Sequence, residues 1–248
     1  MKTLVYAGLL SALTFFSGIA SATPITVTVE GTVTNSRDDF GFFGLGNGYN
    51  TLLGASISAV FTFDSNYAGY DFASSNPNRG DYRGGSWPSP DWVTSTVDID
   101  TSTVDSTLTP GDLVSDEDIF YDRLLIQNED HSGSGLDRYY VIDRVRDQSP
   151  YEDGYHYAQI YSYVDNLITS LDPGQTLSWD ANDFGSDTGQ GYFRYYNSSP
   201  TGYSNFGYRI DTYTVTAGIS SVPEPSYLIL MALGLLGLSI KRRSATRI

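Results

Sequence analysis

Four tyrosines at alternate positions are the residues of this sequence whose type and spacing best suit ligand binding. Because side chains alternate between the two faces of a β-strand, one set of residues in this stretch shares a face and the other set points away from it. The pattern therefore predicts a row of tyrosines opposite a core-facing row. The core-facing row is Ala158, Ile160, Ser162 and Val164, and the opposite row is Tyr155, Tyr157, Tyr161 and Tyr163.

A row of tyrosines suits sugars as ligands. The C–H face of a sugar ring stacks on an aromatic ring, while its hydroxyl groups find acceptors on nearby Asp and Asn side chains. Tyr192 and Tyr196 predict a second, similar row. In the alternative interpretation, the tyrosines fill a second packed interface and their hydroxyl groups are hydrogen-bonded at its rim. The sequence leaves both interpretations open.

Catalytic patterns are weak by comparison. Asp187-Thr188-Gly189 matches the tripeptide of aspartic proteases, but that chemistry needs two such carboxylates, and no second Asp-Thr-Gly or Asp-Ser-Gly is present. The two histidines are His131, in a polar loop, and His156, at the start of a strand, and no Gly-x-Ser-x-Gly elbow accompanies them. We therefore expect no enzymatic activity.

Two acidic segments suit calcium. Asn128–Gly133 has oxygen-bearing side chains at its first, third and fifth positions and glycine at its sixth, as calcium loops do. Tyr139 stands where the helix–loop–helix version has a bidentate glutamate, so that version is excluded. Asp116-Glu117-Asp118 offers three adjacent carboxylates. The simpler interpretation is a pair of solvated acidic loops, so we expect no cofactor, with calcium as the alternative.

The first 22 residues have the order of a secretory signal peptide. Lys2 precedes an apolar run over Leu4–Phe16, and Ala20-Ser21-Ala22 forms an A-x-A cleavage site. The run is too short for a membrane-spanning helix. We expect a signal helix that is cleaved after Ala22, with Ala20 and Ala22 as the small residues of the site, and an exported protein that starts near Thr23.

An apolar segment followed by cations lies near the other end. Residues 227–240 are almost wholly apolar, and Lys241, Arg242 and Arg243 follow them. Such a helix would reach roughly 21 Å, less than the hydrocarbon thickness of about 30 Å. Its position and the cations nevertheless predict a C-terminal transmembrane helix that stops at the cytoplasmic side of the membrane.

Val222-Pro223-Glu224-Pro225, the apolar segment and the basic end follow one another in the order of a known signal. Together they resemble the PEP-CTERM sorting signal of exopolysaccharide-producing Gram-negative bacteria. The resemblance implies that an exosortase, an integral-membrane cysteine protease, is the partner during export and removes the tail. It also implies transient anchoring in the inner membrane and a final place in the cell envelope or extracellular matrix. The two prolines would keep the motif extended and accessible.

Residues 23–221 predict an all-β body. Period-two alternation over Ile25–Val33, Ala55–Phe63 and Val93–Ile99 predicts strands with one buried and one wet face. No three-turn amphipathic helix is present, so we expect an antiparallel β-sandwich or jelly-roll-like body, with the signal helix before it and the transmembrane helix after it. Further predicted strands are 119–127, 139–146, 156–164, 191–195 and 207–217, and the predicted turns include 76–80, 172–174 and 197–200.

The composition of the body excludes several classes of function. It holds 28 acidic residues and nine arginines with no lysine, for a formal net charge of −19. Such a surface repels nucleic acid and anionic lipid headgroups. The chain has no cysteine, which excludes a disulfide scaffold, a thiolate zinc site and a cysteine nucleophile. The long loops near 35–53 and 64–92 are where a binding site is expected.

The sequence as a whole predicts an exported surface or extracellular-matrix protein, without catalysis, that is associated with exopolysaccharide or biofilm. One alternative is a carbohydrate-binding, lectin-like module. A second is a carboxylate-dependent glycoside hydrolase, which needs only two suitably spaced acids. The predicted segments are the signal peptide 1–22, the body 23–221 and the sorting tail 222–248, in which the motif 222–225 precedes the helix 227–240 and the basic end 241–248.

Overall fold

The computed structural model describes most of the body. All of the described residues lie within one compact unit, Thr23–Gly218. The expected signal peptide and sorting tail lie outside the described residues, and so do Lys241, Arg242 and Arg243. Within the described part of the chain, no helix has the length and apolar character needed to cross a membrane. The described residues are 24–43, 47–64, 76–83, 91–100, 105–110, 114, 119–128, 136–148, 151–163, 167–184 and 189–218.

The described residues form antiparallel strands and one short helix, so the prediction of an all-β antiparallel fold is confirmed. The helix, α2, spans only Ala181–Phe184. The strands are β1 (Pro24–Asp38), β2 (Gly48–Tyr49), β3 (Ser56–Asp64), β4 (Arg79–Arg83), β5 (Val93–Asp100), β6 (Asp105–Leu108), β7 (Ile119–Phe120), β8 (Arg123–Asn128), β9 (Asp137–Gln148), β10 (Tyr151–Ser162), β11 (Leu177–Asp180), β12 (Gly189–Ser198) and β13 (Thr201–Ala217).

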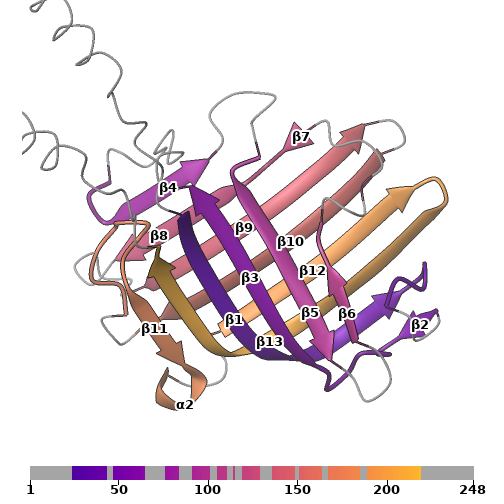
Figure 1. The fold of residues 1–248 in the computed structure, drawn as a ribbon, viewed down its shortest axis with the longest axis horizontal. Helices are drawn as coiled ribbons and strands as arrows, with labels where there is room; N and C mark the ends of the chain where they lie inside the picture. Colours follow the sequence, from indigo (N-terminus) through magenta and orange to yellow (C-terminus); the bar gives the residue numbers. More distant parts are fainter. Residues whose placement is uncertain are drawn as a thin grey trace, which may run out of the picture. The chain divides into compact units, whose positions relative to one another are not determined.

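All thirteen strands belong to one sheet, whose main order is β4-β8-β9-β10-β12-β13-β1-β3-β5-β6. The two longest strands, β1 and β13, pair with each other at its centre, with register shifts at Glu30/Gly31 and Val33/Asn35. The two halves of β13 have different neighbours. Its first half pairs with β12 and its second half pairs with β11. Irregularities of this kind bend a sheet, and in Figure 1 β3 and β5 cross over the strands from β9 to β12.

The structure therefore has one antiparallel sheet where a sandwich of two was expected, and this sheet folds over on itself. Contacts between the two layers show this directly. The ring of Phe61 in β3 stacks on His156 in β10, with ring centroids 4.4 Å apart. The Ser95 hydroxyl in β5 donates to Asp143 Oδ2 in β9 over 2.7 Å. The face-to-face packing encloses a continuous apolar core whose largest members are Trp179, Tyr139, Tyr208, Tyr213, Phe43, Phe61, Phe193 and Phe206.

Several acidic side chains lie inside the protein instead of on a solvated surface. Asp38, for example, accepts hydrogen bonds from the backbone N–H groups of Phe42 and Phe43 and from the Ser204 hydroxyl. Burial of a carboxylate is tolerable only when such donors replace water. The buried acidic residues in the described part of the chain are Asp38, Asp81, Asp122, Asp137, Asp143, Asp147, Glu152 and Asp153.

Candidate functional site

The outward face of the layer formed by β9, β10, β12 and the first half of β13 is rich in tyrosine. Residues paired across neighbouring strands point to the same side of a sheet. Tyr157 in β10 pairs with Tyr192 in β12. Tyr140 in β9 pairs with Gln159, which follows Tyr157 on the same face of β10. We call the set Tyr140, Tyr155, Tyr157 and Tyr192 the outer tyrosine face.

The structure places the predicted tyrosine row on this outward face. Tyr155, Tyr157 and Tyr161 are half-buried, and Tyr163, just beyond the end of β10, is 61% exposed. On the opposite side, Ala158, Ile160 and Ser162 are buried as expected, while Val164 lies outside the described residues. Tyr196 is also outward-facing, but it packs on Tyr151 and Tyr203 at another part of the face. The role of these tyrosines in sugar binding stays a prediction.

The rings of the outer tyrosine face hold one another in place. Tyr140 and Tyr155 share a hydrogen bond between their hydroxyl groups at 3.2 Å. The Tyr157 ring lies 5.4 Å from that of Tyr140 and 6.2 Å from that of Tyr192, measured between centroids. Burial raises the pKa of Tyr155, Tyr157 and Tyr192, so their hydroxyl groups stay protonated at neutral pH and keep a proton to donate.

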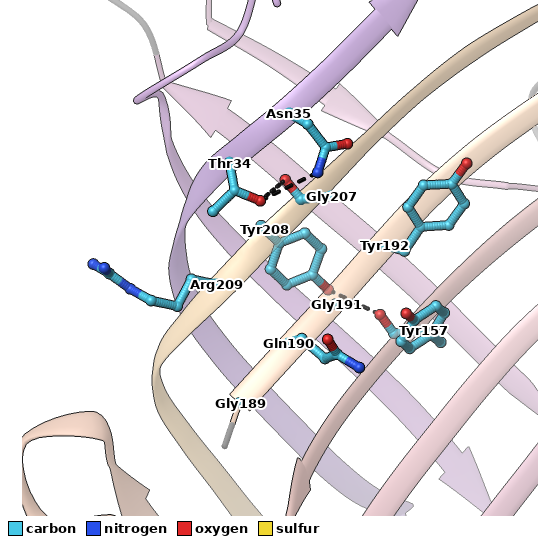
Figure 2. Close-up of a pocket in the computed structure, with 10 residues that line it drawn as sticks. All are labelled: Thr34, Asn35, Tyr157, Gly189, Gln190, Gly191, Tyr192, Gly207, Tyr208 and Arg209. Carbon is cyan, nitrogen blue, oxygen red and sulfur yellow. Dashed lines mark hydrogen bonds between the residues drawn. The ribbon is translucent and has the colours of Figure 1, made fainter. Parts of the chain in front are cut away.

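A pocket of about 380 Å³ adjoins this face (Figure 2). Tyr157 and Tyr192 lie on one side of it and the β1 residues Thr34 and Asn35 on the other. Glycines of β12 and β13 contribute bare backbone between these walls. The full lining is Thr34, Asn35, Tyr157, Gly189, Gln190, Gly191, Tyr192, Gly207, Tyr208 and Arg209.

Two of the glycines lie where a side chain would meet a close neighbour. A Cβ on Gly191 would lie 2.0 Å from Cζ of Tyr208, whose ring crosses below it. A Cβ on Gly207 would lie 2.8 Å from Nδ2 of Asn35. The resulting site combines aromatic ring faces with the amide groups of Asn35 and Gln190, while the guanidinium of Arg209 points away from them and pairs with Asp211. Such a combination can stack on a sugar ring and exchange hydrogen bonds with its hydroxyl groups.

A Ser-His-Asp set is present, but in the core and in the wrong order for catalysis. His156 is 0% exposed; its Nδ1 lies 2.9 Å from the Ser95 hydroxyl and its Nε2 lies 2.9 Å from the Tyr208 hydroxyl. Ser95 in turn donates to Asp143, so the serine stands between the histidine and the acid. In a catalytic triad the histidine stands between the other two. Burial lowers the pKa of His156 to about 3, which keeps the ring neutral.

Asp143 is the acid of this set, and a second buried carboxyl group, that of Asp122, lies near it. Burial raises the pKa of both Asp122 and Asp143 well above the usual range. Asp122 is held by the backbone N–H groups of Trp92, Val93 and Arg144. Both carboxylate oxygens of Asp122 therefore accept hydrogen bonds from the backbone of the fold.

The remaining catalytic and calcium candidates are mostly outside the described residues. His131, Asp187 and Asp116-Glu117-Asp118 all lie there, as does most of Asn128–Gly133. Asn128 itself ends β8 and donates through Nδ2 to the Ile168 carbonyl over 2.5 Å. No group of three or more potential metal-ligating side chains occurs among the residues that the structure describes.

The fold and the face define an antiparallel all-β protein with a row of tyrosines and a shallow polar pocket on one outward surface. A family model described as the PEP-CTERM protein-sorting motif matches residues 221–243. The match confirms that the chain carries a PEP-CTERM sorting motif, as the resemblance that includes Val222–Pro225 predicted. The motif indicates export, processing by an exosortase and sorting to the cell envelope. A comparison with curated proteins found no match.

Proposed function

We propose that this protein is a non-catalytic component of the cell surface or extracellular matrix and that it binds polysaccharide through the outer tyrosine face. The observation that carries the proposal is the pocket of about 380 Å³ between Tyr157, Tyr192 and Asn35. Its rings, amides and hydroxyls are the groups that recognise sugars, and its open form suits a long chain that passes across the surface.

The absence of catalysis is supported by the state of the titratable core. A general base must reach its substrate and have a pKa near the working pH. His156 is fully buried, and its pKa of about 3 makes it a poor base. Asp122 and Asp143 are held in the core by backbone N–H groups and by Ser95. A core built in this way serves the packing of the two layers.

The mode of delivery that we propose follows from the sorting tail. Residues 227–240 anchor the protein in the inner membrane until the exosortase cuts the tail. The body then stays in the envelope or joins the extracellular polysaccharide. An outward sugar-binding face gives such a released body a means of retention in the matrix without a membrane anchor.

The proposal is tested with the secreted protein, produced from the full-length chain, and with polysaccharide purified from the host's own matrix. The double variant Tyr157→Ala/Tyr192→Ala removes both rings of the pocket wall, and we expect it to weaken binding by about tenfold or more. Tyr49→Ala is the matched control, because Tyr49 is 72% exposed in β2 and does not line the pocket. Unchanged binding in the double variant, or no binding by the wild type, would refute the proposal.

A further inference from the structure

All nine arginines of the body lie on the same outward face as the tyrosines. The strand register places them there: Arg144, Tyr155 and Arg194 are directly paired across β9, β10 and β12, and the other arginines occupy positions that point to the same side. The body has a formal net charge of −19, so this one-sided placement sets the face apart from the rest of the surface. The nine are Arg37, Arg79, Arg83, Arg123, Arg138, Arg144, Arg146, Arg194 and Arg209.

The outward face of the other layer has the opposite character. Its strands present threonines, serines and acids, and a second pocket there is lined by Glu30, Asp98, Asp100 and Asp211. Among the described residues, all of the arginines therefore lie on one layer, where several of them pair with acids, whereas the outward face of the other layer carries acids without arginines. A charge separation of this kind orients a charged ligand toward one face.

Three of the arginines converge on a single buried carboxylate, Asp153, which is 1% exposed. Arg144 binds it through Nε at 2.7 Å and through Nη2 at 3.0 Å, and Arg146 binds it through Nε at 3.2 Å. Arg194 donates to the second oxygen of Asp153. We call these four residues the Asp153 cluster. Its formal charge is +2, since three cations share one anion.

The Asp153 cluster has many more donors than its carboxylate can use. Three guanidinium groups offer about fifteen N–H donors, whereas one carboxylate has about four acceptor sites. Each of the three arginine side chains is about a quarter exposed, from 24% to 27%. The cluster therefore presents charged donors at the surface, in the forked geometry that binds carboxylates and other oxyanions in a bidentate manner.

The tyrosines fix these guanidinium groups in place. Cζ of Arg144 lies 5.5 Å from the centroid of the Tyr155 ring, and Cζ of Arg194 lies 5.6 Å from the same centroid. Arg146 lies over the Tyr121 ring at 4.8 Å. Stacking on an aromatic face holds a guanidinium without consuming its in-plane N–H donors. Tyr155 thus contacts the Asp153 cluster and also belongs to the outer tyrosine face.

We infer that the ligand of the outer tyrosine face is an anionic polysaccharide, and that the Asp153 cluster binds its carboxylate groups, as in a chain that contains uronic acids. The inference rests on the proposed function and specifies its substrate class. Asp153 and Tyr157 are four residues apart on β10, which corresponds to about 14 Å along the strand. A polysaccharide that lies along β10 places sugar rings on Tyr157 and Tyr192 and a carboxylate at the arginines.

The test compares the host's matrix polysaccharide before and after chemical reduction of its carboxyl groups, which keeps the sugar backbone and removes the charge. We expect the secreted wild-type protein to bind the reduced polymer at least about tenfold more weakly, and its binding to the native polymer to weaken with added salt. Binding that is unchanged by carboxyl reduction would overturn the anionic assignment while leaving the proposed function intact. Failure to bind either polymer would overturn both.

A pair of variants with the same net charge locates the effect. Arg146→Gln removes the arginine whose contact with Asp153 is longest, and we expect it to weaken binding to the native polymer by about tenfold while leaving binding to the reduced polymer unchanged. Thr96→Glu makes an equal change in net charge on the outward side of β5, and we expect an effect of less than about twofold. Equal losses in the two variants would contradict a specific anion site.

Discussion

At the scale of single residues, a chain of polar side chains runs through the core from Asp143 through Ser95 and His156 to Tyr208. Ser95 donates its hydroxyl proton to Asp143, and Nδ1 of His156 lies 2.9 Å from the same hydroxyl. Nε2 of His156 lies 2.9 Å from the Tyr208 hydroxyl, which also donates to the Tyr157 carbonyl over 3.2 Å. The neutral histidine thus connects β5, β10 and β13 inside the fold, and protonation would break this arrangement.

The pH dependence of stability tests the neutral state of His156. Its pKa in the folded protein, about 3, is below the ordinary value of 6.5. Between these two pH values the unfolded chain therefore binds a proton at His156 and the folded protein does not. The stability that the folded protein gains from a neutral His156 is therefore fully present above about pH 6.5 and is lost as the pH falls toward about 3. Chemical denaturation of the wild type and of His156→Gln, which hydrogen-bonds without titrating, would measure it.

We expect the stability advantage of the wild type over His156→Gln to shrink by about 1.4 kcal/mol per pH unit between about pH 6 and pH 4. Asp122 and Asp143 act in the opposite direction, because their raised pKa values favour the folded state as they become protonated. Both carboxyl groups are present in the two proteins, so the comparison largely cancels their effect. If the free energies of unfolding of the wild type and of His156→Gln changed in parallel with pH, His156 would not be held neutral by the fold.

At the scale of elements, the sequence predicts the strands that show simple alternation, and tertiary contacts decide the rest. The predicted strand 119–127 is divided into β7 and β8 because Asp122 turns inward and caps the backbone N–H groups of Trp92 and Val93. The predicted turn at 76–80 does occur, but it leads directly into β4, which pairs with β8. Neither feature has a local sequence signal, since both depend on residues far along the chain.

A substitution at Gly191 tests the packing of β12 against β13. Because a Cβ there would meet the Tyr208 ring at 2.0 Å, Gly191→Ala must displace that ring and weaken its hydrogen bond with His156. We expect a loss of about 1–3 kcal/mol in the free energy of unfolding. Gly174→Ala is the control, because its Cβ would have only ordinary contacts of 3.4 Å or more, and we expect a change within about 0.5 kcal/mol. Similar losses at both positions would contradict the close approach.

At the scale of the whole molecule, part of the candidate site is encoded along one strand and part only in the fold. The alternation in β10 suffices to predict that Tyr155 and Tyr157 share a face. Tyr140 and Tyr192 join them through the register of β9 and β12, which the sequence does not specify. Asn35 was expected in a long loop, but β1 continues to Asp38, whose carboxylate binds the following backbone N–H groups. The pocket therefore lies on strands instead of the loops where it was expected.

The pairing of β1 with β13 at the centre of the sheet also bears on how the exported protein is processed. Ile25 of β1 pairs with Ala217 of β13, and the backbone N–H of Gly218 donates to the Pro24 carbonyl over 2.8 Å. All strands of the described part of the chain lie between residues 24 and 218, so cuts outside these limits remove none of the described strands. We expect intact-mass measurement and terminal peptide mapping of the extracellular protein to give a product that begins near Thr23 and ends at or before about Pro225. A product found only in membranes and still containing residues 227–240 would show that the tail is a permanent anchor, and the outer tyrosine face would then act on a tethered protein.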